Sequence, residues 1–395
     1  MTQNYDVAII GGGLAGLTLA CLLGNGGLRV GIIDAADPQK PMRGDERTTA
    51  ISYGSALILQ QAGIWEDLNG RGAPIRDIKI LDGDSALLLQ FLSEEVGNKD
   101  FGTIFLNSDI RAALNNNVKA SENIDLIAPA KVSDFKVDKD GILTILEDAR
   151  IIHSKLAIGA DGRNSFMREW LDIDTRAWSY NQRAVVCIAR HENPHHNVAV
   201  EHFMPDGPFA ILPMADDEEG NHRSSIVFTE HGPERKSRMR LSQEEFVSLL
   251  QKRFPADYGT IEMAGERSVY PLSLVHAASY IGPRMALVAD AAHGIHPIAG
   301  QGLNLGFRDV KEIAALVLKA HKAGQDIGSA DLLKTYQRRR RPDNMAMVAF
   351  TDGLVRLFSN NLPPLKLARR LGLKAVGKIP LAKRFFMKQA MADRS

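Results

Sequence analysis

The stretch YDVAIIGGGLAG at residues 5–16 decides the fold of this 395-residue chain. Residues 5–10 form a short apolar run with β-branched members, which predicts a buried strand. The glycines follow directly, residues 15–23 have helical character, and residues 29–33 predict a second strand that ends at Asp34. A GxGxxG motif between the strand and the helix of such a unit is typical of dinucleotide binding. The segment therefore predicts a Rossmann-like α/β domain.

Each position of this motif has a physical role. Gly11 permits the tight turn, Gly13 lets the backbone approach a pyrophosphate, and Gly16 lets helix and strand pack closely. The start of the helix offers unpaired N–H groups and a positive dipole end to phosphate. Asp34 comes at the end of the second strand, where its carboxylate can accept hydrogen bonds from ribose hydroxyls. The predicted cofactor contacts in this segment are Gly11, Gly13, Leu14, Ala15, Gly16 and Asp34. These residues alone leave FAD and NAD open.

A second glycine loop favours a flavin. Residues 285–289 (MALVA) predict a buried strand that delivers Asp290, residues 297–302 (PIAGQG) predict a loop, and residues 303–318 predict a helix. Glycines at a loop-to-helix start let backbone N–H groups approach the edge of a flat ring, and the helix N-terminus favours the negative charge of a reduced flavin. The alternative is an ordinary strand-turn-helix with Asp290 as the N-cap, in which the glycines would be costly.

Composition argues against several other kinds of protein. The 48 basic and 47 acidic residues nearly balance, so no nucleic-acid partner is indicated. Two cysteines provide neither a disulfide framework nor a thiolate metal site, which fits a reducing compartment. The first residues lack a basic segment, so we expect no secretory signal, and no run of about 20 apolar residues occurs in the sequence. We expect a cytoplasmic protein that is attached at most to the inner face of the cytoplasmic membrane.

Further segments complete an ordered set of motifs along the chain. They are RGDERTTAIS at 43–52, NSDIRAAL at 107–114, GADGRNSFMR at 159–168, GPFAILP at 207–213, YPL at 270–272, the run 289–309, RPDN at 341–344 and TDGL at 351–354. Together these segments resemble the UbiH/Coq6 family of ubiquinone-biosynthesis hydroxylases, which are class A flavoprotein monooxygenases. The resemblance covers nearly the whole chain. It is specific for the family and does not select a member.

The resemblance implies an α/β fold like that of p-hydroxybenzoate hydroxylase, in which a Rossmann-like FAD-binding domain is interleaved with an antiparallel-sheet substrate domain and followed by C-terminal helices. The short β-like runs between residues 178 and 274, separated by polar turns, independently predict an antiparallel sheet. The expected divisions are 1–75, 100–175 and 275–330 for the FAD-binding domain, 76–99 and 176–274 for the substrate domain, and 331–395 for a C-terminal helical region with a basic tail.

The resemblance also assigns site residues. Cofactor contacts expected beyond the first motif are Arg47, Arg111, Asp161, Asp290, Pro297, Gly300, Gln301, Gly302, Leu303 and Asn304. Flavin or substrate contacts are expected at His296, Pro297, Phe209 and Leu212. Arg163 and Arg168 fit phosphate contacts and surface ion pairs equally well. No side chain is singled out as a catalytic base, and His293 and His296 lack the further ligands that a metal site needs.

The implied reaction hydroxylates the aromatic ring of a polyprenylated phenol in ubiquinone biosynthesis, with O₂ as co-substrate, through a flavin C4a-hydroperoxide. A second GxGxxG after a strand is missing, so the expected electron donor is transiently bound NAD(P)H or a reductase protein. The alternatives are a halogenase or prenyl reductase on the same scaffold and a non-catalytic dinucleotide-fold binding protein.

The composition of the C-terminal tail indicates which partners the protein contacts. Residues 366–395 hold nine Lys and Arg and one acidic residue, mixed with Leu, Val and Phe. A basic, partly apolar segment is attracted to anionic headgroups. We expect a tail that contacts a membrane surface or other ubiquinone-biosynthesis proteins, with a solvated terminal helix or a homo-oligomer contact as the alternative. The run Arg338–Arg341 predicts one charged helix end.

Overall fold

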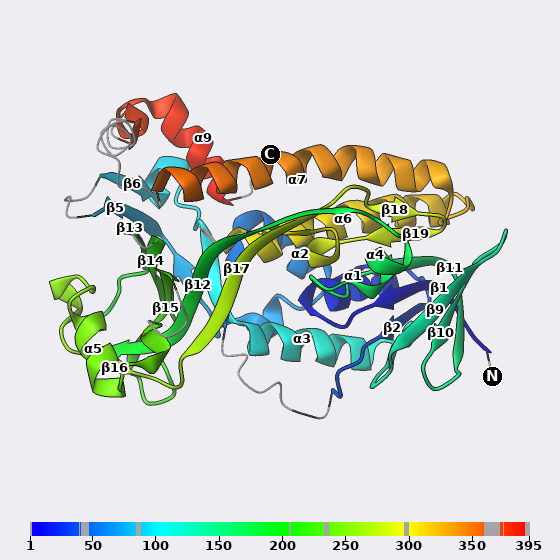
Figure 1. Ribbon diagram of the computed structural model, residues 1–395, viewed down its shortest axis with the longest axis horizontal. Coiled ribbons are helices and arrows are strands. Elements are labelled where there is room, and N and C mark those ends of the chain that lie inside the picture. Colours follow the sequence, from blue (N-terminus) through cyan, green and yellow to red (C-terminus); the bar gives the residue numbers. More distant parts are fainter. Residues whose placement is uncertain are drawn as a thin grey trace.

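The described residues form three β-sheets, and the two larger ones draw on segments that are far apart in the sequence (Figure 1). The computed structural model describes residues 2–38, 40, 47–83, 88–204, 207–232, 237–295, 300–358, 372–373 and 375–391. The mixed α/β architecture, with a parallel sheet, an antiparallel sheet and C-terminal helices, confirms the fold expected from the sequence.

The first sheet has the order β18-β19-β11-β1-β2-β8, and β9 and β10 extend it from β11. Its strands are β1 (Thr2–Ile10), β2 (Val30–Ile33), β8 (Ile124–Ile127), β9 (Val132–Val137), β10 (Ile142–Leu146), β11 (Ile151–Gly159), β18 (Ile281–Gly282) and β19 (Met285–Leu287). The five strands from β19 to β8 run parallel. Their carboxyl ends therefore meet at one edge, which is where ligands bind in open α/β sheets.

Helices cover this sheet because its strands are apolar on both faces. Helix α1 (Leu14–Asn25) packs against α3 (Asn107–Ala120) and α6 (Gln301–Lys322). The short α4 (Phe166–Trp170) follows β11. The largest buried apolar cluster of the described residues joins this sheet to α1, α3 and α6.

The second sheet is antiparallel apart from one parallel pair, β13 with β5. It has the order β20-β17-β12-β15-β14-β13-β5-β6, and β16 pairs with β12. Its strands are β5 (Asp77–Asp82), β6 (Leu89–Leu92), β12 (Thr175–His191), β13 (Val198–Met204), β14 (Gly207–Met214), β15 (His222–His231), β16 (Ile261–Met263), β17 (Ser268–Ala277) and β20 (His293–Gly294). The long strands β12 and β17 run from this sheet toward the first one (Figure 1). Helix α5 (Gln243–Gln251) packs beside β16.

A small sheet with the order β3-β7-β4 connects the two larger ones. Its strands are β3 (Thr48–Ser52), β4 (Ala73–Ile75) and β7 (Gly102–Leu106), and α2 (Tyr53–Gln61) follows β3. Strands β4 and β7 contact β14, whereas β3 contacts α6. The Thr48 hydroxyl lies 2.6 Å from the Ser225 hydroxyl of β15. The small sheet thus fixes the second sheet relative to the start of α6.

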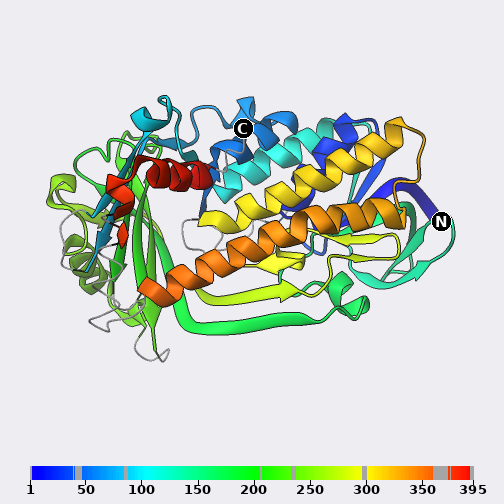
Figure 2. The same cartoon turned by 90° about the horizontal axis from the view of Figure 1, so that it is seen from above.

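Two C-terminal helices complete the structure. The long α7 (Ala330–Phe358) packs along α6 and extends from the first sheet to the second (Figures 1 and 2). Helix α9 (Pro380–Met391) lies next to β6 at the far end of α7. Met387 and Met391 of α9 are buried in an apolar cluster with Phe91 and Phe101. No helix in the described ranges is both long and apolar enough to cross a membrane.

Candidate cofactor and substrate site

A continuous cavity of about 1350 Å³ lies where the first sheet, the small sheet and the second sheet meet. One part of its wall comes from the carboxyl edge of the parallel sheet and the start of α6. This part is lined by Gly13, Leu14, Ala15, Arg47, Arg111, Ala160, Gly162, Asp290, Gly300, Gln301, Gly302, Leu303 and Asn304, among others. The remaining wall is mostly apolar and comes from the second sheet, α7 and the C-terminal segment. Segments separated by nearly 300 residues thus share one cavity.

The glycine turn after β1 is packed directly against the loop after β11. Gly11 has a φ of 109°, and a Cβ there would lie 2.4 Å from the carbonyl oxygen of Ala160. A side chain at this position would therefore force the two loops apart, in addition to the backbone strain. The role assigned to Gly11 from the sequence, a tight turn, agrees with this geometry.

The N-terminus of α1 is open toward the cavity. Gly13 is its N-cap without a side-chain hydrogen bond, and a Cβ on Gly13 would meet no atom within 4 Å. The first N–H groups of a helix have no intrahelical partner, and a phosphate satisfies them. The Nη1 of Arg111, from α3, donates to the carbonyl oxygen of Gly12 at 3.2 Å. A guanidinium therefore lies beside the open helix end.

Asp34 lies next to the same turn, at the end of β2. Its carboxylate accepts hydrogen bonds from the backbone N–H of Gly12 and, at 2.6 Å, from that of Ala36. The carboxylate is thus anchored at the glycine turn by two backbone groups. Its contact with a ribose stays a prediction.

Asp290 follows β19 on a short 3₁₀ turn, Ala289–Ala291, and its carboxylate faces the cavity. The Nε of Arg163 lies 3.2 Å from its Oδ2, and Nη2 of Arg163 donates to the carbonyl oxygen of Ile295 at 3.1 Å. The Nη1 of Arg168 donates to the carbonyl oxygen of Ala291 at 2.9 Å. Both arginines therefore hold the Asp290 loop. Arg163 does so partly through an ion pair with Asp290, which agrees with one of the two alternatives from the sequence. A phosphate contact of either arginine stays a prediction.

The start of α6 forms the opposite side of this part of the cavity. Its N-cap, Gly300, has a φ of 62° and makes no side-chain cap. The buried amide of Asn304 donates to the carbonyl oxygens of Ala50 (2.8 Å) and Gly300 (3.0 Å) and accepts from the Ser52 N–H (3.0 Å). Asn304 thus ties α6 to β3, so its side chain positions the loop in addition to bordering the cavity.

These features fit a flavin dinucleotide. Two helix N-termini without side-chain caps, those of α1 and α6, border one cavity. One suits a pyrophosphate, and the other suits the electron-rich edge of an isoalloxazine ring. The Asp290 carboxylate lines the same cavity and is an acceptor suited to the hydroxyl groups of a ribityl chain. Which atoms of FAD each residue contacts stays a prediction.

Comparison with known proteins decides the family. Residues 4–351 match the family model described as FAD binding domain. The chain is 42% identical to ubiquinone hydroxylase UbiL of Rhodospirillum rubrum, over 98% of this chain and 89% of the relative. It is 33% identical to the 3-demethoxyubiquinol 3-hydroxylase of Escherichia coli, over 98% of this chain and 99% of the relative. The chain belongs to the UbiH/Coq6 family. It is an FAD-dependent monooxygenase, as expected from the sequence.

A solved structure agrees with the fold. The p-nitrophenol 4-monooxygenase of Pseudomonas putida superimposes with a TM-score of 0.81 over the full length of both chains, at 19% sequence identity. At this identity the likeness concerns the fold alone.

A buried polar network behind the Asp290 loop was not found from the sequence. Asp309 of α6 is fully buried and contacts His293 (2.5 Å), Arg340 (2.7 Å) and Asn344 (3.0 Å). Burial alone would raise the pKa of Asp309, but the neighbouring His293 and Arg340 hold it at about 2. The interpretation of residues 338–341 as a charged helix end is therefore wrong: the run lies inside α7, and Arg340 is buried. The one sequence signal for this buried network is the spacing of Arg340 and Asn344, which places both side chains on the same face of a helix.

One expected contact is corrected by the structure. Phe209 is fully buried against Phe228 and Phe254 on the face of the second sheet that turns away from the cavity, whereas Leu212 lines the cavity. The Asp161 carboxylate accepts a hydrogen bond from the backbone N–H of Met167 at 3.1 Å, at the segment that leads into α4. Its contact with the cofactor stays a prediction. His296 and Pro297 lie outside the described residues.

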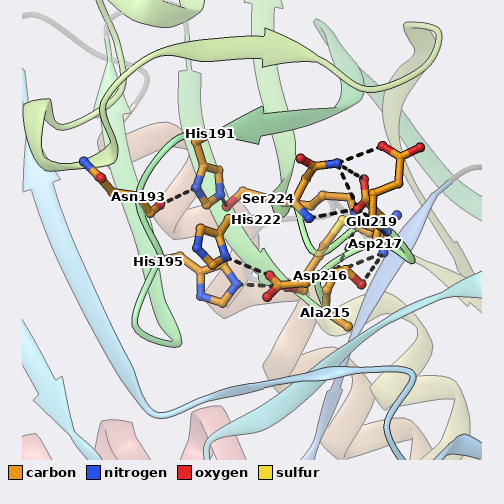
Figure 3. A network of polar contacts seen from close by, with 12 residues as sticks. His191, Asn193, His195, Ala215, Asp216, Asp217, Glu219, His222 and Ser224 are labelled. Carbon is orange, nitrogen blue, oxygen red and sulfur yellow. Dashed lines mark hydrogen bonds and ion pairs between the residues drawn. The ribbon is translucent and has the colours of Figure 1, made fainter.

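Several histidines gather at another place, at the ends of β12 and β15 (Figure 3). His191 is hydrogen-bonded to Ser224 at 2.9 Å, and Nδ1 of His222 lies 3.0 Å from Oδ1 of Asp216. Burial lowers the pKa of His191. Across the described part of the chain, no group of His, Cys, Asp or Glu side chains has the arrangement of a metal site. None of the residues labelled in Figure 3 lines the cavity.

Proposed function

We propose that this monooxygenase hydroxylates the aromatic ring of a polyprenylated phenol in ubiquinone biosynthesis. The observation that carries the proposal is the division of one cavity into a cofactor part and a long apolar part. The names of the relatives support it, because they include a ubiquinone hydroxylase and a 3-demethoxyubiquinol 3-hydroxylase.

The apolar part of the cavity suits a prenyl chain. Its lining includes Ile78, Ile80, Leu89, Phe91, Phe101, Ala199, Phe203 and Leu212 from the sheets, Met347, Phe350, Leu354, Leu357 and Phe358 from α7, and Leu373, Val376, Phe386 and Ala390 from the C-terminal segment. A hydrocarbon chain gains about 0.8 kcal/mol for each methylene that it buries. A small phenol without a chain would leave most of this wall uncovered. The substrate is therefore a phenol with a long apolar substituent.

Bound FAD would activate O₂, and one oxygen atom of O₂ would be added to a carbon of the aromatic ring. The chain contributes positioning and a dry environment. The uncapped N-terminus of α6 stabilises negative charge at the edge of the cavity that it borders. The apolar walls exclude water, which strengthens each electrostatic interaction inside and protects reactive species from hydrolysis. The Asn304 amide keeps this helix start in place through β3.

We further propose that the enzyme works at a membrane surface, since its substrate is lipid-soluble. Helix α9 and the residue before it expose Ile379, Leu381 and Phe385, with Leu381 exposing 82% of its surface. Lys378 and Arg384 lie on the same segment. Exposed apolar side chains among cations are typical of interfacial helices. The electron donor in this proposal is transiently bound NAD(P)H or a reductase protein.

Oxygen-isotope incorporation tests the proposed function. The FAD-loaded protein is reduced, mixed with ¹⁸O₂ and a short-chain prenylated phenol, and the product is analysed by mass spectrometry. We expect a ring hydroxyl that carries ¹⁸O. Hydrogen peroxide as the sole product, with the bound phenol unchanged, would overturn the proposal. Quinone profiling of a strain that lacks this protein then identifies the hydroxylated ring position from the precursor that accumulates.

A further inference from the structure

One carboxyl group stands on the apolar wall of the cavity. Glu201 is on β13, and residues of a strand that are two apart point to the same side. Its neighbours on that side, Ala199 and Phe203, also line the cavity. The ring of Phe203 stacks on Phe358 of α7, with centroids 3.7 Å apart. The Glu201 side chain therefore lies in the part of the cavity that is closed by α7.

From β5 to β12, the residues that pair across the sheet in the row of Glu201 are otherwise apolar. Glu201 pairs with Ala210 of β14 on one side and with Ile80 of β5 on the other. Ala210 pairs in turn with Val227, and Val227 with Val186. All five of these residues line the cavity. A carboxylate in such a row costs folding free energy unless a partner satisfies it.

No hydrogen bond or ion pair reaches the Glu201 carboxylate from the residues that the structure describes. Burial raises its pKa to about 7. The side chain is only partly exposed. A carboxyl group in a cavity whose pKa is raised by desolvation is a candidate for a functional role. A hydrogen-bond donor that enters the cavity can reach this carboxylate, and the hydroxyl group of a phenol is such a donor.

We propose that the Glu201 carboxylate accepts a hydrogen bond from the phenolic hydroxyl of the substrate and takes its proton during ring hydroxylation, an inference that rests on the function proposed above. It places the aromatic ring against the β13–β14 part of the wall. The prenyl chain then lies along the apolar lining contributed by α7 and α9.

The proton balance of this step is closed. The phenol O–H bond breaks, a carboxyl O–H bond forms, and the electron pair on the ring oxygen moves into the ring. A ring carbon then bonds to the hydroxyl oxygen derived from O₂, whose O–O bond breaks, and the departing oxygen keeps that electron pair. When the ring C–H bond breaks, its proton leaves to water and the ring oxygen takes back the proton of the carboxyl group. Glu201 ends ionised, as it began. A base whose pKa lies near the working pH is suited to such a transfer.

Other ionisable groups must be considered in a pH profile. Those that line the cavity include Arg47, Arg111, Arg163, Tyr270 and Asp290. Asp82 lies on β5, two residues beyond Ile80, and pairs with Phe203. His202, next to Glu201, is hydrogen-bonded to the carbonyl oxygen of Gly83. Variants of Glu201 itself are therefore needed to assign a titration to this group.

Binding to the oxidised FAD-loaded enzyme provides the test. The probes are 2-geranylphenol and its methyl ether, which differ in the ability to donate a hydrogen bond, and binding is followed by perturbation of the flavin absorbance. A hydrogen bond to a charged acceptor contributes about 1.5–3 kcal/mol, so at pH 8 we expect the phenol to bind about 10- to 100-fold more tightly than the ether. This preference should shrink below about pH 7, where the carboxyl group becomes protonated.

Glu201→Gln keeps the shape of the side chain and should remove the pH dependence of the preference, with a fall in kcat of about 100-fold. Glu201→Leu should abolish the preference. Glu262→Gln makes the same change on the exposed part of β16 and serves as the control. FAD content and melting temperature show that each variant is folded. If a variant does not fold, the proposal is still tested by the wild type, through its preference for the phenol over the ether and the pH dependence of that preference.

The inference is overturned if the enzyme takes up FAD and hydroxylates the phenol, but Glu201→Gln has the same preference for the phenol and the same kcat as the wild type. The proposed function then stays intact. A wild type without any pH-dependent preference for the phenol also overturns the inference. A protein that takes up no FAD, or that never hydroxylates a prenylated phenol, overturns both.

Discussion

The Nε2 of His293 lies 2.5 Å from Oδ2 of Asp309, and both side chains are buried behind the Asp290 loop. The same carboxylate oxygen accepts the backbone N–H of Ala289 at 3.1 Å. Ala289 has a φ of 52°, an uncommon conformation for a residue with a Cβ. Asp309 therefore holds the backbone on both sides of Asp290, and α6 carries both this support and the helix start at Gly300.

Asp309→Asn should weaken FAD binding. The substitution removes a buried charge and leaves Arg340 without its main counter-ion, and breaking a buried pair in this way costs about 3–5 kcal/mol of stability. We expect the Kd for FAD to rise at least about tenfold, because the Asp290 turn loses its support. Titration of the apoprotein, followed by flavin fluorescence, measures this. Asp326→Asn, which breaks the more exposed pair with Arg284, is the control and should leave the Kd for FAD unchanged. Equal affinities in Asp309→Asn and wild type would contradict the account.

His276 should make the stability depend on pH. Burial, together with the neighbouring His293, lowers the pKa of His276 to about 4, and the hydroxyl of Tyr280 lies 2.9 Å from its Nε2. Since the folded pKa lies below the unfolded value of about 6.5, this stabilisation is complete above pH 6.5 and is lost as the pH falls toward 4. Between pH 7.5 and 5, we expect His276 to account for about 2 kcal/mol of the decrease in the free energy of unfolding. Urea unfolding of the wild type and His276→Gln measures the difference. Parallel pH profiles of the two proteins would count against this assignment.

Comparing Gly300→Ala with Gly324→Ala shows whether an effect on FAD binding comes from general backbone strain or from a changed cofactor site. Both glycines flank α6 with similar left-handed φ values, 62° and 64°. An Ala at either position should cost about 1 kcal/mol of stability. A Cβ at Gly324 meets nothing within 4 Å, whereas one at Gly300 lies 3.2 Å from the Cβ of Ala50. We therefore expect only Gly300→Ala to weaken FAD binding, by several-fold. Similar FAD affinities in the two variants would show that the start of α6 does not position the cofactor.

Leu381→Glu and Phe385→Glu should reduce binding to anionic vesicles. The two side chains expose 82% and 58% of their surfaces, and a charge on an interfacial apolar face opposes insertion. Co-sedimentation with phosphatidylglycerol vesicles measures the effect, and we expect a loss of at least about tenfold in the double variant. Val137→Glu, on β9 of the first sheet, is the control, because it places the same charge at an exposed apolar residue elsewhere. Point variants are preferable to truncation, since Phe386 and Ala390 line the cavity. If the double variant sediments with the vesicles as the wild type does, α9 is not the segment that binds the membrane.

The sequence predicted the parts of the fold that depend on neighbours along the chain. The apolar run at residues 5–10 lies in β1, and the glycines after it form the turn at the carboxyl edge of the first sheet. The wrong expectation for Phe209 has a simple cause: residues three apart on a strand point to opposite faces, so Phe209 and Leu212 cannot both line one cavity. The Asp309 network joins side chains from α6, α7 and β20, which local patterns do not bring together. Glu201 was not noticed because only the register of β13 with β14 and β5 shows that its row is apolar.

The most direct test of the account is a crystal structure of the protein with FAD and a prenylated phenol. We expect the pyrophosphate at the N-terminus of α1, the flavin ring against the start of α6, and the prenyl chain between the second sheet and α7. A flavin bound elsewhere would contradict the central claim. So would a phenol whose chain lies outside the cavity.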